Sequence, residues 1–132
     1  MAPIRDDSTL ATNLDIVPTI LKIAGQKVPT DLPGLDVLDE KAMAARKSIF
    51  LEVYTHDIAD LSAPAKSLVT RVVINEWSKL LIPGTAKLLK YKATAPTTIE
   101  LYDLKSDPQE QTNLATTRPE EVKRLQAIQD AV

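Results

Sequence analysis

Aliphatic residues recur with a helical period in the first part of the chain. The stripe has members three or four positions apart, namely Leu14, Val17, Leu21 and Ala24, with Ile20 beside them. Gly25 follows as a helix stop, so the spacing predicts a helix over about residues 14–24. Pro18 fits the first turn of a helix better than its interior, which moves the expected start toward Ile16. Ile16 and Ile23 lie away from the stripe, which indicates burial on more than one side of the helix.

The last part of the chain carries a second helical pattern. Its apolar stripe consists of Val122, Leu125, Ile128 and Val132. Thr117 and Glu120 have the spacing of a capping box, and Pro119 suits a first helical turn. Glu120 and Arg124 are spaced for an i,i+4 ion pair. These features predict an amphipathic C-terminal helix.

Between the two helical patterns, short apolar runs alternate with turn-forming residues. The runs cover residues 48–54, 68–74, 77–82 and 99–104. Each run has the length and the aliphatic, β-branched content typical of a strand. Asn75 and Glu76 leave room only for a tight hairpin between the second and third runs. Residues 84–98 combine turn residues with Leu88, Leu89 and Tyr91, which would fit an edge strand, so the sequence leaves this stretch open.

Strands joined by short links, with a helix on either side in the sequence, indicate an α+β fold. We expect a small antiparallel sheet of three to four strands, with an N-terminal helix and a C-terminal amphipathic helix packed on it. Residues 1–47 are expected to hold a lead-in, the first helix and a Pro/Gly-rich connection that contains a short helical turn near residues 41–45. Residues 48–132 are expected to form the sheet and the second helix as one subdomain.

Composition narrows the classes of function. The 132 residues suffice for one domain, and 16 Lys and Arg against 18 Asp and Glu give a net charge of −2, which disfavours nucleic-acid binding. The chain has no Cys, which excludes disulfides, thiolate metal sites and a cysteine nucleophile. The chain has one histidine, His56, so a site that needs two imidazoles from this chain is excluded. No apolar stretch has the length of a membrane span, and no export signal is visible, which says little about compartment if the chain is a fragment.

Two short motifs resemble parts of metal or catalytic sites. Asp6 and Asp7 could offer oxygen ligands to Ca²⁺ or Mg²⁺, but no apolar strand precedes them, so a solvated charge run is favoured. Ser62, Pro64 and Lys66 place a hydroxyl near a cation, but their loop lacks a base in reach, so a surface turn is favoured. We expect no metal ligand and no catalytic residue in either motif.

Charged residues in or after the strands are the other candidates. His56 lies beside Asp57, two residues past a strand end, where a role in substrate contact is a weaker alternative to an exposed or structural one. Glu52, Arg71 and Lys79 each lie inside an apolar strand and could form a Glu–Arg or Glu–Lys cross-strand pair. A solvated sheet face is favoured over a functional cluster. Residue chemistry alone therefore gives no complete catalytic constellation.

Motifs in fixed order resemble segments of sulfatases in the alkaline phosphatase superfamily. Residues 13–25 read NLDIVPTILKIAG and are similar to the family's D-[IL]-x-P-T-[IL]-L-x-[IL]-A-G segment. Residues 33–36, PGLD, resemble its G-x-[DS]-L turn. Two of its strands are resembled by residues 71–74, RVVI, and 77–82, WSKLLI. Residues 100–115 read ELYDLKSDPQEQTNLA and are similar to its E-L-Y-D-L-x-x-D-P-x-E-x-x-N-L signature.

A further motif, EVYTHD at residues 52–57, looks like an E-x-[FY]-x-H-D variant of bacterial members. The resemblance runs from about Leu10 to the last helix and implies the C-terminal region of a bacterial-type, arylsulfatase-like enzyme. The implied partner is a larger α/β catalytic domain, from whose end residues 1–47 would continue. Family members are often exported to the periplasm or the extracellular space.

The resemblance also implies where the chemistry of such an enzyme lies. In the family, a formylglycine made from a Cys/Ser-x-Pro/Ala-x-Arg motif hydrolyses the sulfate ester, and Asp and Asn residues hold a Ca²⁺. Both lie upstream of the matched stretch, so the resemblance implies no catalytic residue, no metal ligand and no cofactor in this chain. It leaves His56 as a candidate for the substrate-facing rim.

A different class of function stays open beside the sulfatase fragment. The chain could be a stand-alone, non-catalytic interaction module, for example a homodimer formed through an apolar patch that a catalytic domain would otherwise cover. The fragment interpretation predicts no sulfatase turnover by the chain alone. Neither interpretation calls for a nucleic-acid partner or a membrane span.

Overall fold

A computed structural model describes residues 6, 8–58, 60–86 and 95–132. The chain divides into two compact units, residues 1–49 and 50–132, and each is described by itself. Within the described part of the chain, no helix combines the length and apolar character needed to cross a membrane. The expectation that residues 1–47 continue from a catalytic domain stays a prediction.

The first unit contains a short 3₁₀ turn, η1 (Asn13–Asp15), that leads directly into α1 (Ile16–Ile23), and a later short helix, α2 (Glu40–Ala45). Thr12 begins the turn with a capping box. Its hydroxyl accepts a hydrogen bond from the Leu14 N–H, and the N–H of Thr12 donates to the Asp15 carboxylate. Gly25, at φ 68°, ends α1 in the left-handed conformation that favours glycine. The expected start near Ile16 and the stop at Gly25 are therefore confirmed.

The buried side at η1 and α1 carries two polar residues beside Pro18, contrary to expectation. Asp15, Pro18 and Thr19 are the buried residues at η1 and α1. The aliphatic residues around them are at least half exposed: Leu14, Ile16, Val17, Ile20 and Ile23. The sequence pattern identified an apolar face correctly, but the described residues of the first unit leave that face exposed.

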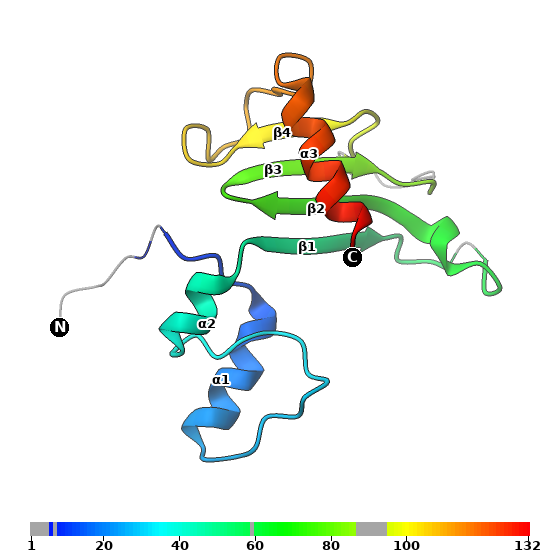
Figure 1. The fold of residues 1–132 in the computed structure, drawn as a ribbon. Helices are drawn as coiled ribbons and strands as arrows, with labels where there is room; N and C mark the ends of the chain where they lie inside the picture. The colour runs from blue at the N-terminus through cyan, green and yellow to red at the C-terminus, as the bar shows by residue number, and fades with distance from the viewer. Residues whose placement is uncertain (1–5, 7, 59, 87–94) are drawn as a thin grey trace. The chain divides into compact units, whose positions relative to one another are not determined.

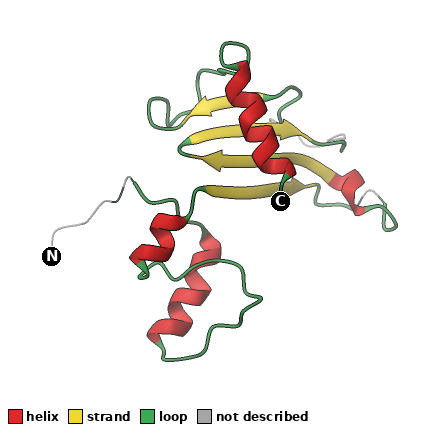
Figure 2. Cartoon of the chain, in the orientation of Figure 1, coloured by secondary structure: helices red, strands yellow, loops and turns green. Residues whose placement is uncertain are grey.

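The second unit is built on a four-stranded antiparallel sheet in the order β1-β2-β3-β4 (Figures 1 and 2). Its elements are β1 (Ser48–Tyr54), a 3₁₀ turn η2 (Pro64–Ser67), β2 (Leu68–Asn75), β3 (Ser78–Pro83), β4 (Glu100–Asp103) and α3 (Pro119–Asp130). With the helices of the first unit and α3, this is the expected α+β fold.

The core of the second unit lies between the sheet and α3, which crosses β3 and β2 diagonally (Figure 1). Val73 of β2, Leu80 of β3 and Leu101 of β4 are paired across the sheet on the face that α3 covers. Val122 and Leu125 of α3 pack on them. The C-terminal helix thus buries its apolar stripe as its period predicts.

The β2–β3 hairpin turns one residue later than expected. Its central residues are Glu76 and Trp77, with φ of 49° and 72°, and β3 therefore begins at Ser78 rather than at Trp77. Positive φ at both central positions is the geometry that matches the twist of a two-residue hairpin, although Asn and Gly adopt it more readily. The Trp77 carbonyl accepts a hydrogen bond from Leu104 N at 2.9 Å, which holds the turn.

Two predicted details of α3 are wrong. The N-cap is Arg118 with no side-chain cap, because the Thr117 hydroxyl donates to the Leu114 carbonyl instead. Glu120 pairs with Lys123 rather than with Arg124. Arg124 reaches toward the sheet, where it pairs with Glu121 and donates to the Asn75 side chain at 2.7 Å.

Only part of the open stretch 84–98 can be assigned. The N–H groups of Gly84 and Ala86 donate to the Val69 and Leu68 carbonyls, so pairing with β2 continues just beyond β3. Leu88, Leu89 and Tyr91, the residues proposed for an edge strand, lie outside the described residues.

Candidate functional site

The carboxylate of Asp15 is fully buried and is the most heavily bonded polar group of the first unit. Both guanidinium Nη atoms of Arg46 donate to it at 2.6 Å. The N–H groups of Thr12 and Leu35 each donate to it at 2.8 Å. These bonds, with the Arg46 contacts largest, hold the pKa of Asp15 well below its ordinary value.

The neighbouring motif residues extend this cluster. The Thr19 hydroxyl donates to the Asp15 carbonyl at 2.6 Å and accepts from Val37 N at 2.9 Å. Gly34 has a φ of 102°, and a Cβ there would overlap the Leu14 carbonyl. Residues 13–25 and 33–36 are therefore parts of one structural motif, in which the loop after α1 is hydrogen-bonded to the helix and packed closely against it.

Arg46 is the member of this cluster that the sequence did not reveal. It lies 31 residues from Asp15, and Nη1 also donates to the Leu10 carbonyl at 3.0 Å. A single Arg between an Ala-rich turn and a strand carries no periodic signal. Because every Asp15 and Arg46 contact is internal, the cluster can fix conformation but has no reacting group facing outward.

The signature at residues 100–115 is likewise structural. The Asn113 side-chain oxygen accepts from the N–H of Leu101 at 3.1 Å and of Ala115 at 2.9 Å, and Leu114 N donates to the Leu101 carbonyl at 2.7 Å. Asp107 accepts from the N–H groups of the loop that precedes Asn113. The segment around Asn113 thereby closes the outer edge of β4.

The short motifs that resembled catalytic or metal sites are turns. The Asp60 carboxylate accepts from Ser62 N and Oγ and pairs with Lys66 at 2.7 Å. Asp6 accepts from the N–H groups of Ser8 and Thr9 in the same manner, and Asp7 lies outside the described residues.

His56 is almost fully exposed, and its Nδ1 lies 3.3 Å from an oxygen of Asp57, which is equally exposed. The imidazole projects from the loop after β1 and is free to meet a group outside this chain.

The strand charges divide between the two faces of the sheet. Arg71 Nε donates to Glu52 at 3.0 Å across β1 and β2, which confirms the predicted cross-strand pair. The Tyr54 hydroxyl donates to the other Glu52 oxygen at 2.6 Å, and these two donors lower the pKa of Glu52. Lys79 lies on the opposite face and pairs with Glu110 at 2.8 Å, so it does not join them.

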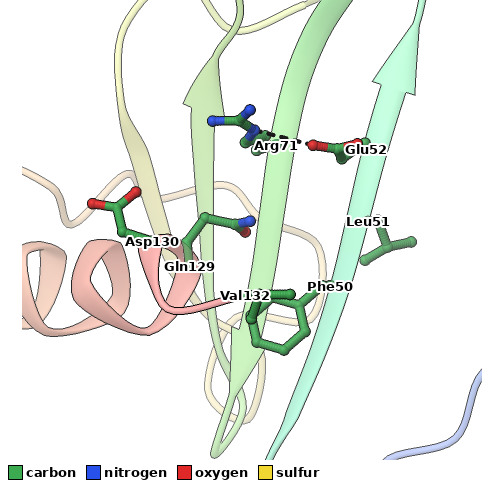
Figure 3. Close-up of a pocket in the computed structure, with 7 residues that line it drawn as sticks. All are labelled: Phe50, Leu51, Glu52, Arg71, Gln129, Asp130 and Val132. Carbon is green, nitrogen blue, oxygen red and sulfur yellow. Dashed lines mark hydrogen bonds and ion pairs between the residues drawn. The ribbon is translucent and has the colours of Figure 1, made fainter.

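A hollow of about 630 Å³ opens beside the Glu52–Arg71 pair (Figure 3). It is lined by Phe50, Leu51, Glu52, Arg71, Gln129, Asp130 and Val132. The side-chain oxygen of Gln129 is buried there, and no donor for it exists within the described residues. Gln129 and Asp130 were not singled out from the sequence, because an apolar stripe is defined by its aliphatic members, although Gln129 lies four residues after Leu125 on the same side of the helix.

The described residues do not fit the calcium ion and the formylglycine that the resemblance implies. Among them, no three acidic, His or Cys side chains converge to hold a metal ion. The whole chain has no Cys, and Ser62, the serine of its nearest comparable motif, is bound to Asp60 in a turn. We therefore derive no catalytic step through either group.

Comparison with known proteins connects these structural motifs to one family. A family model described as N-sulphoglucosamine sulphohydrolase, C-terminal, matches residues 1–130. The chain is 27% identical to arylsulfatase K of Xenopus laevis over 98% of its own length and 24% of that protein. It is 30% identical to arylsulfatase K of Homo sapiens over 86% of its length and 20% of that protein.

Solved structures share the fold. One, described for the metabolism of multiple glycosaminoglycans by Bacteroides thetaiotaomicron, has a TM-score of 0.57 at 22% identity over 89% of this chain and 24% of that one. Another, in complex with its substrate D-glucosamine-2-N,6-O-disulfate, has the same TM-score and identity over 89% of this chain and 22% of that one. The chain thus spans about a fifth to a quarter of the relatives it matches, and it belongs to the C-terminal domain family of the N-sulphoglucosamine sulphohydrolases, as the C-terminal region of a sulfatase.

Proposed function

We propose that this chain packs on the catalytic domain of a parent sulfatase through the exposed apolar face of α1, and that the parent hydrolyses sulfate esters. The observation that carries the proposal is the orientation of α1. Its polar side is anchored inward by Asp15 and Thr19, while Ile16, Ile20 and Ile23 are 56%, 58% and 70% exposed. An apolar patch of this kind on a rigid helix is typical of an interface.

The internal bonds of Asp15 explain why this face cannot turn inward. Rotating α1 to bury its isoleucines would expose the helix side that binds Arg46 and the Leu35 N–H. It would break a buried ion pair whose loss costs about 3–5 kcal/mol. The helix is thus held with its apolar side available to another surface.

We further propose that the loop after β1 contributes His56 to the substrate-facing rim. The exposed imidazole beside Asp57 could donate to or accept from a sulfated substrate. The relatives are arylsulfatases by name, and one structural relative binds a sulfated glucosamine. A sulfate ester, carried by an aryl or an amino-sugar group, is therefore the substrate class we propose for the parent.

A homodimer is the second candidate function, because the same apolar face of α1 could bury itself against a second copy. Light scattering of the chain alone distinguishes the two. A stable dimer that loses its association on Ile20→Lys with Ile23→Lys would support the homodimer and remove the main support for packing on a catalytic domain.

The test of the proposed function uses the parent enzyme with this chain in place. Ile20→Lys with Ile23→Lys should lower the activity recovered on a chromogenic sulfate ester by about tenfold or more, because two charges would be forced into an apolar interface. Ala127→Lys, at an exposed position of α3, is the matched control and should leave activity within about twofold. Equal activity in the two variants would contradict the proposal.

The same assay tests His56. His56→Ala should lower kcat/KM by about tenfold, the effect of losing a hydrogen bond to a charged group, while the folded yield is unchanged. The exposed neighbour Asp57→Asn controls for disturbance of the loop. Unchanged kcat/KM on the best substrate would remove His56 from the rim.

A further inference from the structure

The two edges of the sheet in the second unit differ in how they are finished. The outer edge of β4 is closed by the chain itself, because Leu101 exchanges hydrogen bonds with Asn113 and Leu114. β1 is the other edge strand, and within the described residues of the sheet its one neighbour is β2. Edge strands that stay free are normally protected by Pro or by charged side chains, especially Lys. Phe50–Tyr54 contains neither Pro nor Lys, and its one charged residue, Glu52, is paired with Arg71.

Both faces of β1 are also open. Phe50, Leu51, Val53 and Tyr54 are between 37% and 49% exposed although they lie in mid-strand. On the face that α3 shares, the helix packs on β2 and β3, and the hollow of Figure 3 occupies the space over β1. An added strand would therefore find a free hydrogen-bonding edge and apolar side chains on both sides of it.

The polar lining of the hollow defines what the added segment should carry. Arg71 and Glu52 form an ion pair with each other. Asp130 is the third charged residue of the lining, and it forms no ion pair among the described residues. The last turn of α3 contains no basic residue, although the negative end of a helix dipole favours one. The buried Gln129 oxygen adds an acceptor for which the described part of the chain supplies no donor.

We propose that β1 is the docking edge for an extended segment of the parent sulfatase that adds to the sheet as a fifth strand and places a Lys or Arg side chain in the hollow. The cation would lie between Asp130 and the Gln129 oxygen at the C-terminal end of α3. Strand addition uses main-chain hydrogen bonds for affinity and the side-chain hollow for selection. A Lys or Arg side chain is long enough to reach across β1, since neighbouring strands lie about 4.8 Å apart.

A second copy of this chain is a poorer occupant. Antiparallel pairing of β1 with itself about Leu51 would set Phe50 opposite Glu52 of the second copy. It would bring no Lys or Arg of the strand into either hollow, because residues 48–54 contain none. Neither the carboxylate of Asp130 nor the side-chain oxygen of Gln129 would gain a partner from β1 of the second copy.

The proposal rests on the proposed function, and hydrogen exchange measured by mass spectrometry separates the two. We expect the amides of residues 50–54 to exchange about tenfold or more slowly in the parent than in the isolated chain. The amides of residues 100–103, at the closed edge, are the internal control and should not change. Asp130→Lys in the parent should restore fast exchange at residues 50–54, whereas Glu120→Lys at the other end of α3 should not.

Each result decides a different point. Fast exchange at residues 50–54 in the parent would overturn strand addition, while the α1 lysine variants would still test the packing on a catalytic domain. Exchange at residues 50–54 that stays slow in the Asp130→Lys variant would overturn the proposed contact between Asp130 and a Lys or Arg of the added segment. Slow exchange already present in the isolated chain, together with a dimer mass by light scattering, would make a second copy the occupant and overturn the proposal.

Discussion

A buried carboxylate organises the first unit at the scale of single residues. Asp15 accepts four hydrogen bonds: one from the nearby Thr12 N–H, and three from the sequence-distant Leu35 N–H and Arg46 guanidinium, which donates two of them. Burial of the ionised carboxylate is tolerated because Arg46 pairs with it and backbone N–H groups donate to it. The D-x-x-P-T motif thus acts through structure, with Asp15 and Thr19 facing inward and the intervening aliphatic residues facing outward.

Asp15→Asn should destabilise the first unit by about 3–5 kcal/mol, since it leaves the Arg46 charge unpaired. The folded pKa of Asp15 lies below its ordinary value of 3.8. Its contribution to stability is therefore complete above that value, decreases as the pH falls below 3.8, and is gone once the pH has passed the folded pKa. Far-UV circular dichroism during urea unfolding at pH 7 and at acid pH measures both effects.

The matched control is Asp31→Asn, an exposed aspartate of the same unit. It should change stability by less than about 0.5 kcal/mol. If the Asp15→Asn variant lost as much stability at acid pH as the unchanged chain does, the ion pair with Arg46 would not be the source of that loss.

Residue-scale chemistry was only partly predictable from the sequence. The Glu52–Arg71 pair could be anticipated, because charges inside adjacent apolar strands meet at short range. The Asp15–Arg46 pair could not, because its partners are 31 residues apart and Arg46 belongs to no periodic pattern. Gln129 and Asp130 were missed for a different reason. An apolar stripe is defined by its aliphatic members, so it gives no signal for a polar residue such as Gln129 on the buried side of the helix.

At the scale of elements, periodicity predicted which segments are helices and strands. It also predicted the correct burial of α3, whose stripe packs on the sheet within the same chain. For α1 it predicted an apolar face but not its surroundings, because the period of a pattern is the same whether the covering surface is in this chain or in another. The aliphatic residues of α1 are therefore exposed because the described residues of the first unit supply no surface to cover them.

The β2–β3 hairpin offers a test at this scale. Glu76 holds a φ of 49°, a conformation that Asn adopts at lower cost. Glu76→Asn should therefore stabilise the second unit by about 0.5–1 kcal/mol. Urea unfolding followed by Trp77 fluorescence provides the measurement.

Glu76→Gln is the control for this change, because it removes the same charge and keeps the same backbone cost. It should be neutral within a few tenths of a kcal/mol. A gain in stability as large for Gln as for Asn would attribute the effect to charge and contradict the conformational explanation.

At the scale of the whole molecule, the chain contains two compact units with different optical probes. The large aromatic residues are Phe50, Tyr54, Trp77, Tyr91 and Tyr102, all in the second unit. Trp77 fluorescence therefore reports the second unit, whereas the circular dichroism at 222 nm includes the helices of both. The two signals can show whether the units unfold together.

We expect the units to unfold as separate cooperative steps, since each has its own stabilising cluster: the Asp15–Arg46 bonds in the first, and Val73, Leu80 and Leu125 in the second. Asp15→Asn should weaken the 222 nm signal at low urea and leave the Trp77 midpoint unchanged. Leu125→Ala, at a position with no exposed surface, should cost about 2–5 kcal/mol and shift the Trp77 midpoint downward. A parallel shift of both signals with Asp15→Asn would mean that the chain unfolds as one unit, and the first unit would then depend on the sheet for its stability.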